Sequence, residues 1–288
     1  MMIQPTGSNP PGTLLSVITP VYNGERYIEK CIQAVLNQQC DRVEHLIVDG
    51  GSTDRTIEIV KHYAEQYSHI RWISAKDRGQ SDAMNKGIAL AKGEIITFLN
   101  VDDFYEPNVL NRILEIFQTL PNPSFIAGNC KVWNDDGKVT GINKPKKLGF
   151  KDLLMGFHVN PFPMNPSAYF YHRSLHDQAG LYDVDDHYTM DLDFIIRAVR
   201  VAHTQYFDED WGNYQMLQGT KTMTDTARNT DRDRVEEVLK KYRKSILGFE
   251  QVAVELTFYI YKIRRAIKWF LIRRRDQLKS ATTGLLSS

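Results

Sequence analysis

The stretch Glu94-Ile-Ile-Thr-Phe-Leu-Asn-Val-Asp-Asp103 decides the fold. Its apolar residues, 95–99, form a short run without strict alternation, which is typical of a strand buried on both faces of a parallel sheet. The run ends in Asn100, Asp102 and Asp103. Open α/β sheets bind ligands at the carboxyl ends of their strands, where carboxylates suit Mg²⁺ or Mn²⁺. Alternatively, these acids form only a polar turn that caps the next helix.

The chain up to this stretch alternates between strand-like and helix-like segments. From the spacing of apolar residues we expect strands at 14–20, 43–48, 70–74 and 95–99, and helices at 25–38, 56–67 and 79–91. This alternation predicts an α/β fold with a mostly parallel sheet and helices on both faces.

The pattern changes after residue 106. We expect helices at 107–120 and 192–201, strands at 125–133, 138–142 and 167–171, and a long irregular loop at 144–165. Residues 107–225 are therefore expected to form an α+β half of the same domain, building one wall of a cleft. Residues 226–288 are expected to be a basic, mostly helical extension. Residues 1–13 lack the apolar core of a signal peptide and are expected to be a flexible leader.

Composition limits the classes of partner. The 288 residues carry a net charge of +1, which gives no support for nucleic-acid binding. The three cysteines, Cys31, Cys40 and Cys130, lack the spacing of a zinc site and indicate a reducing compartment. No apolar run approaches the ~20 residues of a membrane span. We therefore expect a cytoplasmic protein.

The C-terminal region combines an apolar stripe with many cations. Val252, Leu256, Ile260, Ile263 and Ile267 recur at three- and four-residue intervals. Eight Lys or Arg residues and one acid lie between residues 262 and 279. A basic amphipathic helix over 252–279 would suit an anionic surface, such as the inner face of the cell membrane. Alternatively, it packs on the body of the protein or on a second subunit.

Polar residues follow each of the first four strands. They are Pro20, Tyr22 and Asn23 after the first, Asp49, Ser52 and Asp54 after the second, Lys76, Asp77 and Asp82 after the third, and Asn100, Asp102 and Asp103 after the fourth. Each cluster alone is ordinary loop polarity, but together they predict a polar crevice at one sheet edge. No glycine-rich phosphate loop is present. A metal held by Asp102 and Asp103 would therefore have to neutralise a diphosphate.

Four motifs resemble those of the family 2 glycosyltransferases. They are Ser16-Val-Ile-Thr-Pro-Val-Tyr-Asn23, Ile47-Val-Asp-Gly-Gly-Ser-Thr-Asp54, Asp77-Arg-Gly-Gln-Ser-Asp-Ala-Met-Asn-Lys-Gly87 and Phe98-Leu-Asn-Val-Asp-Asp103. The resemblance covers residues 14–220 and implies the GT-A fold, an Mn²⁺ or Mg²⁺ cofactor and inverting transfer from a nucleotide sugar. The acceptor would be a glycan or a lipid-linked glycan. Residues 14–106 would then bind the nucleotide sugar, and residues 107–225 the acceptor.

The resemblance also implies a role for individual residues. Asp49 matches the acid that reads the nucleobase. Asp103 and Asp102 match the metal-binding motif, with Asp103 the direct ligand and Asp102 nearer the ribose or donor sugar. Asp191 matches the catalytic base. The donor-binding set would be Pro20, Tyr22, Asn23, Asp49, Ser52, Asp54, Lys76, Asp77, Asp82, Asp102 and Lys221.

Two departures and several alternatives remain open. Many relatives carry an acid that can contact the nucleobase where this chain has Gly50, and its absence weakens the inference of a uridine donor. A UDP-sugar stays the first expectation, with GDP- and dTDP-sugars as alternatives. Relatives often have a histidine near residues 215–221, where this chain offers Lys221 for the diphosphate. Asp191 could instead be a helix N-cap, which would leave Asp193 as the base. The competing functions are a non-catalytic nucleotide-sugar-binding scaffold and a sugar-nucleotide pyrophosphorylase, which would need a glycine-rich basic loop.

Overall fold

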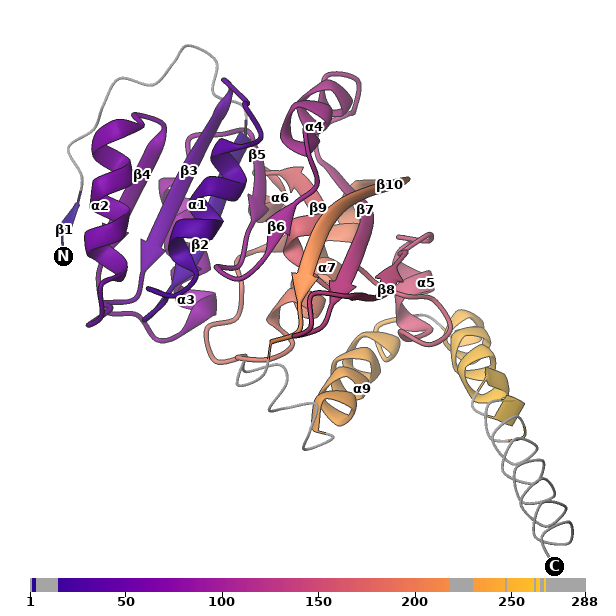
Figure 1. The fold of residues 1–288 in the computed structure, drawn as a ribbon. Coiled ribbons are helices and arrows are strands. Elements are labelled where there is room, and N and C mark those ends of the chain that lie inside the picture. The colour runs from indigo at the N-terminus through magenta and orange to yellow at the C-terminus, as the bar shows by residue number, and fades with distance from the viewer. Residues whose placement is uncertain are drawn as a thin grey trace, which may run out of the picture.

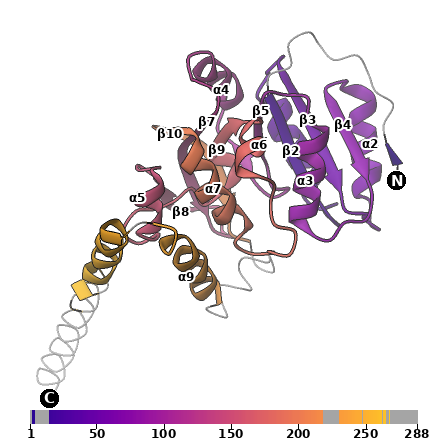
Figure 2. The same ribbon diagram turned by 180° about the vertical axis from the view of Figure 1, so that it is seen from behind.

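One sheet runs through the body of the protein (Figure 1). The computed structural model describes residues 2–3, 15–217, 230–246, 248–261, 263–264 and 267. The strand order is β1-β4-β3-β2-β5-β9-β7-β10-β6, with β8 paired to β7. Helices cover both faces of this sheet, as the sequence predicted (Figures 1 and 2).

The four predicted parallel strands form one half of the sheet. They are β2 (Leu15–Val21), β3 (Val43–Asp49), β4 (Ile70–Ser74) and β5 (Ile95–Phe98). β2 lies between β3 and β5 and runs parallel to both. β2 and β3 are buried along their whole length, as expected for strands between two helix layers. Because the strand order reverses at β2, the ends of β2 and β5 flank the point where such sheets bind ligands.

The alternation of side chains along the strands separates two core regions. α1 (Ile28–Leu36) and α2 (Thr56–Gln66) pack against Val21 and Ile47 on one face. α3 (Gln80–Leu90) packs against Ile18 and Leu46 on the other. α4 (Val109–Phe117) shares an apolar cluster with α1. The helices thus leave the carboxyl edge of the parallel strands to loops.

The second half extends the sheet in mixed directions. Its elements are β6 (Phe104–Tyr105), β7 (Ser124–Trp133), β8 (Val139–Asn143), α5 (Phe150–Leu154), the 3₁₀ helix η1 (Pro166–Ala168), β9 (Tyr169–His172), α6 (Leu175–Ala179), α7 (Met190–Val201) and β10 (His203–Gln215). β9 pairs antiparallel with both β5 and β7, so it joins the two halves. The sequence analysis did not predict β10, which lies parallel to β7.

A short strand lies near the N-terminus, and helices lie in the C-terminal region. β1 (Met2–Ile3) pairs antiparallel with β4, so these two residues form a strand where a flexible leader was predicted. The free edge of β4 offers unpaired backbone groups that explain this pairing. α9 (Thr230–Arg243) contacts α5 and α7, and residues 248–261 are helical. None of the helices in the described ranges has the length and apolar character needed to cross a membrane.

Candidate active site

Asp103 follows β5 and lies where three segments converge. The residue is 3% exposed. Its Oδ2 accepts hydrogen bonds from the side-chain amides of Asn100 (2.9 Å) and Asn165 (2.7 Å), and its Oδ1 accepts one from the backbone N–H of Gln215 (3.1 Å). Burial, and then the negative charge of Asp102, raise the pKa of Asp103 to about 7. This carboxylate therefore ties the β5 loop to η1 and β10.

Asp102 has a more open environment. It is half-buried, and burial raises the pKa of its carboxyl group. Within the described part of the chain, no side chain donates a hydrogen bond to this carboxylate. Asp102 therefore has oxygens to offer to a ligand, whereas both oxygens of Asp103 are already hydrogen-bonded.

The loops after β2 and β3 hold each other in place. The backbone N–H of Asn23 donates to Ser52 Oγ (2.8 Å), and Asn23 Oδ1 accepts from the backbone N–H of Thr53 (2.9 Å). Asp54 Oδ2 accepts from the backbone N–H of Glu25 (3.0 Å). Three residues of the predicted donor-binding set, Asn23, Ser52 and Asp54, thus shape this edge of the sheet.

Asp49 is wholly buried beneath the same loop. Its carboxylate accepts hydrogen bonds from the backbone N–H groups of Gly51 (3.0 Å) and Ser52 (3.0 Å) and from the hydroxyl groups of Ser52 and Ser74. The structure thus places Asp49 as an internal support of the loop. Tyr22 is 64% exposed at the edge, whereas Pro20 is buried within β2.

The third cluster lies between β4 and α3. Asp82 Oδ2 accepts from the backbone N–H of Arg78 (3.1 Å) and lies 3.0 Å from Lys86 Nζ, so it stabilises the start of α3. Lys76 is exposed. Asp77 Oδ1 accepts from the backbone N–H of Gly79 (2.9 Å). Lys221 lies outside the described residues.

Asp191 lies in the first turn of α7, and the N-cap of that helix is Thr189. The alternative that Asp191 is the N-cap is therefore wrong. The hydroxyl group of Tyr169 donates to Asp191 Oδ1 (3.2 Å). Burial, and then the charge of Asp191, hold the pKa of Tyr169 well above its ordinary value, so this hydroxyl stays protonated. Because Asn165 contacts Asp103, the short segment 165–169 links the acidic pair to Asp191.

Asp193 points to a different part of the molecule. It is 7% exposed and accepts hydrogen bonds from Arg197 Nε (2.8 Å), Lys241 Nζ (3.0 Å) and the Tyr242 hydroxyl (2.7 Å). Burial alone would raise its pKa, but the bonds from Tyr242, Lys241 and Arg197 outweigh burial and lower the pKa. Asp193 therefore docks α9 onto α7, which contradicts its place as the alternative base.

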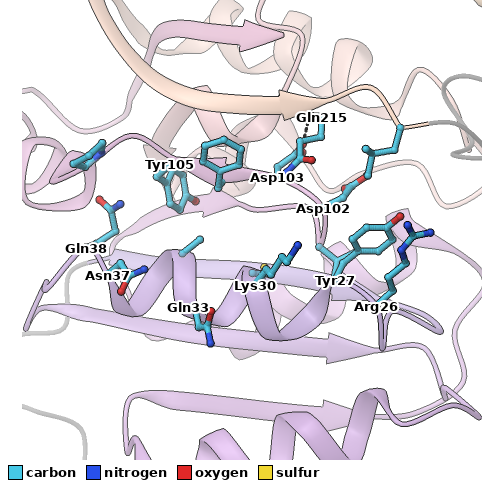
Figure 3. A pocket seen from close by; sticks show the side chains of 16 residues that line it. Arg26, Tyr27, Lys30, Gln33, Asn37, Gln38, Asp102, Asp103, Tyr105 and Gln215 are labelled. Carbon is cyan, nitrogen blue, oxygen red and sulfur yellow. Dashed lines mark hydrogen bonds between the residues drawn. The ribbon is translucent and has the colours of Figure 1, made fainter. Parts of the chain in front are cut away.

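A cavity of about 600 Å³ lies between α1 and the loop that carries the acidic pair (Figure 3). Asp102, Asp103 and Gln215 line one side of it, and Arg26 and Lys30 line the other. The sequence analysis did not single out these two cations. Arg26 lies in the turn before α1, Lys30 lies in the first turn of that helix, and Tyr27 between them also lines the cavity. The four-residue spacing of the two cations in the helix expected at residues 25–38 was the available signal.

The geometry can be compared with known proteins. The family model described as "Glycosyl transferase family 2" matches residues 16–178. The chain belongs to this family. The predicted resemblance is thereby confirmed, and family membership places the chain among the glycosyltransferases.

Family members and solved structures resemble this chain over different lengths. The uncharacterized glycosyltransferase EpsJ of Bacillus subtilis is 29% identical over 243 residues, which are 81% of this chain and 69% of that protein. Chondroitin synthase of Escherichia coli is 36% identical over 105 residues, 36% of this chain but 15% of that protein. The chain thus spans only part of these glycosyltransferases.

The structural relatives confirm the fold. TarS 1–349 of S. aureus, solved in complex with UDP, gives a TM-score of 0.62 at 17% identity and covers 85% of this chain and 69% of that one. The mannosyltransferase PcManGT from Pyrobaculum calidifontis, in complex with GDP-Man and Mn²⁺, gives 0.57 at 17% identity and covers 81% and 65%. Within the described residues, no group of three or more His, Cys, Asp or Glu side chains is arranged to hold a metal ion.

Proposed function

We propose that this protein transfers a sugar, with inversion, from a nucleoside-diphosphate sugar to a hydroxyl group of a glycan or lipid-linked glycan. The observation that carries the proposal is the link between the acidic pair and Asp191. Asn165 contacts Asp103 at one end of a five-residue segment, and Tyr169 contacts Asp191 at the other. A site for the leaving diphosphate and a base for the acceptor hydroxyl are both needed for in-line displacement.

The acidic pair suits a divalent cation. Mg²⁺ and Mn²⁺ take one or two carboxylates and complete their ligands with water and substrate phosphates. Asp102 offers oxygens, whereas Asp103 is buried and bonded to three donors. We therefore assign the direct contact to Asp102 and a supporting role to Asp103, the reverse of the order that the resemblance implies. A bound cation would stabilise the negative charge of the departing nucleoside diphosphate.

Asp191 would take the proton of the acceptor hydroxyl. The hydrogen bond from Tyr169 holds the carboxylate in one orientation, and Tyr169 is itself fixed because it is wholly buried in the core. On the opposite side of the acidic pair, Arg26 and Lys30 would add positive charge that attracts phosphate. The complexes of TarS with UDP and UDP-GlcNAc and of PcManGT with GDP-Man support a UDP- or GDP-linked donor.

Calorimetry and product release test this function. We expect the protein to bind UDP or GDP only when Mn²⁺ or Mg²⁺ is present, and to release nucleoside diphosphate from a matching nucleotide sugar. Asp191→Asn should keep the binding and lose the release, because only the base is removed. A scaffold protein would bind the nucleotide sugar and leave it intact. Absence of metal-dependent nucleotide binding in the full chain would exclude the proposed activity.

We also propose that the helix at residues 248–261, together with the basic residues that follow it in the sequence, contacts an anionic membrane surface. Phe249 is 81% exposed, and Val252, Leu256, Ile260 and Ile263 are exposed at helical spacing. The sequence adds eight Lys or Arg residues between 262 and 279. Apolar side chains beside cations favour anionic lipid headgroups.

Flotation with lipid vesicles tests the membrane contact. The full chain should bind phosphatidylglycerol vesicles more tightly than phosphatidylcholine vesicles. Leu256→Asp with Ile260→Asp should abolish the binding, whereas Val139→Asp, at another exposed apolar residue, should not. Equal binding by all variants, or self-association in place of vesicle binding, would contradict the proposal.

A further inference from the structure

The loop that precedes α7 lies against the donor half of the molecule. The Ser81 hydroxyl group, in the first turn of α3, donates to the carbonyl oxygen of Asp186 (2.9 Å). A Cβ atom on Gly79, the N-cap of α3, would lie 3.3 Å from the His187 ring, so this ring packs directly on the glycine. The loop therefore rests on the start of a helix that follows one of the four parallel strands.

Hydrogen bonds within the loop fix its end relative to α7. The Asp186 carboxylate accepts from the backbone N–H groups of Tyr188 (2.9 Å) and Thr189 (2.8 Å) and from the Thr189 hydroxyl group (2.7 Å). Thr189 is the N-cap of α7, and Asp191 lies in the first turn of that helix. A displacement of Tyr188 would therefore be transmitted to Asp191.

The helix α9 contacts this loop from outside. Arg234 Cζ lies 3.7 Å from the centroid of the Tyr188 ring, which is within the range of a cation–π interaction. Tyr188 is 49% exposed, and Arg234 is half-buried. Asp193, two residues after Asp191, accepts hydrogen bonds from the same helix. The helix α9 thus contacts the segment that carries Asp191 on both sides of this residue.

The other end of α9 is held independently of the loop. Arg243 is buried, its Nε donates to the carbonyl oxygen of Leu154 (2.8 Å), and its Nη1 lies 2.8 Å from a carboxylate oxygen of Glu236. Its guanidinium group also lies 4.4 Å from the centroid of the Phe258 ring. Loss of the Arg234 side chain should therefore leave α9 folded and docked on α5.

We propose that Arg234 is a positioning residue for the reaction, because through Tyr188 it holds the loop that sets the place of Asp191. The inference rests on the proposed function, since it takes Asp191 as the base. The helix α9 lies beyond residues 16–178, which the family model matches. The C-terminal region of this chain thus serves the position of the base in addition to the membrane contact proposed above.

Release of nucleoside diphosphate from a nucleotide sugar tests this inference in the full chain, with Mn²⁺ present and water as the acceptor. Arg234→Ala should lower kcat by about 2- to 30-fold, the range expected for losing a cation–π contact. The KM for the nucleotide sugar should stay unchanged, and the Tm should fall by no more than about 4 °C. Because water is the acceptor, weaker binding of a glycan cannot account for a lower kcat.

Conservative variants and a matched control separate positioning from a general structural role. Arg234→Lys keeps a cation and should restore most of the rate, and Tyr188→Phe keeps the ring and should react like the wild type. Tyr188→Leu should be as slow as Arg234→Ala, and the double variant should be no slower than either, because both changes remove one contact. Lys240→Ala removes an exposed cation of the same helix and should leave kcat unchanged.

Hydrogen exchange gives a readout that does not depend on activity. Arg234→Ala should speed amide exchange in residues 186–193, whereas exchange in β2 and β3 should stay the same. Wild-type kcat and wild-type exchange in Arg234→Ala, or additive losses in the double variant, would overturn the inference while leaving the proposed function standing. A wild type that releases no nucleoside diphosphate from any nucleotide sugar would instead overturn the proposed function, and the inference with it.

Discussion

Removing the carboxylates of Asp102 and Asp103 one at a time should separate metal binding from folding. Asp103→Ala leaves three donors without their acceptor: the buried amide of Asn165, the half-buried amide of Asn100 and the half-buried N–H of Gln215. Each unsatisfied buried donor costs about 1–3 kcal/mol. Relief of a buried charge offsets part of this cost, so we expect a net loss of about 2–4 kcal/mol in the free energy of unfolding.

Asp102→Ala should behave in the opposite way. No described side chain donates to this carboxylate, and its removal relieves the repulsion that helps to raise the pKa of Asp103. We expect the free energy of unfolding to change by no more than about 0.5 kcal/mol. Metal-dependent nucleotide binding should fall by at least about 100-fold, because the charged group that contacts the cation is lost.

Urea unfolding without metal measures the first effect, and calorimetric titration of UDP with and without Mn²⁺ measures the second. Asp103→Asn, which keeps the side-chain shape, allows binding to be measured if Asp103→Ala does not fold. The assignment would be refuted if Asp102→Ala bound UDP and Mn²⁺ like the wild type while folded Asp103→Asn did not. That result would restore Asp103 as the direct metal ligand.

Four further predictions follow from individual contacts. Burial and the charge of Asp102 raise the pKa of Asp103 to about 7, and a cation at Asp102 should lower this pKa. Binding of Mn²⁺ and UDP should therefore release protons at pH 6.5 but not at pH 8.5. Calorimetry in buffers of different ionisation enthalpy measures this proton release. Asp193→Asn should reduce the free energy of unfolding by about 1–3 kcal/mol at pH 7. Because the folded pKa of Asp193 is lowered, this contribution is present above the unfolded value and lost as the pH falls through the folded one, so urea curves of the two proteins should converge in acid. Tyr169→Phe should slow transfer by roughly 10-fold while the Kd for UDP stays unchanged, since only the orientation of Asp191 is lost. Arg26→Ala and Lys30→Ala should each raise the KM for the nucleotide sugar without changing the Tm, because both side chains line the cavity beside Asp102. A KM equal to that of the wild type would exclude the substituted residue from phosphate binding.

The parallel strands could be predicted because each is a short apolar run, and such a run is a local sequence signal of a buried strand. β10 could not, because its middle carries Asp208, Glu209 and Asp210. Each of these acids pairs with a cation that is distant in the sequence: Lys144 with Asp208 (2.7 Å), Arg112 with Glu209 (3.0 Å) and Lys131 with Asp210 (3.3 Å). Partners that are far apart in the sequence leave no local pattern.

In the candidate site, too, features set by local sequence could be predicted, whereas features set by contacts between distant residues could not. The sequence predicted which acids reach the carboxyl edge, because strand ends determine that. It did not predict the different environments of Asp102 and Asp103, because these depend on Asn165 and Gln215, 62 and 112 residues away from Asp103. Likewise, a Cβ atom at Gly50 would lie 2.5 Å from Asp77 Oδ2, and this close approach depends on the packing of the loops that follow β3 and β4.

The position of Asp103 explains why the fold would keep two adjacent carboxylates at an energetic cost. The three donors around Asp103 favour the ionised carboxylate, whereas burial and Asp102 oppose its ionisation. A cation at Asp102 would remove the second of these penalties, so the interactions that hold η1 and β10 to the β5 loop would strengthen when the cation binds. Because η1 also leads to Tyr169 and hence to Asp191, the same event would firm the position of the base. Asp103, which would not contact the metal, would therefore couple the donor half of the site to the acceptor half.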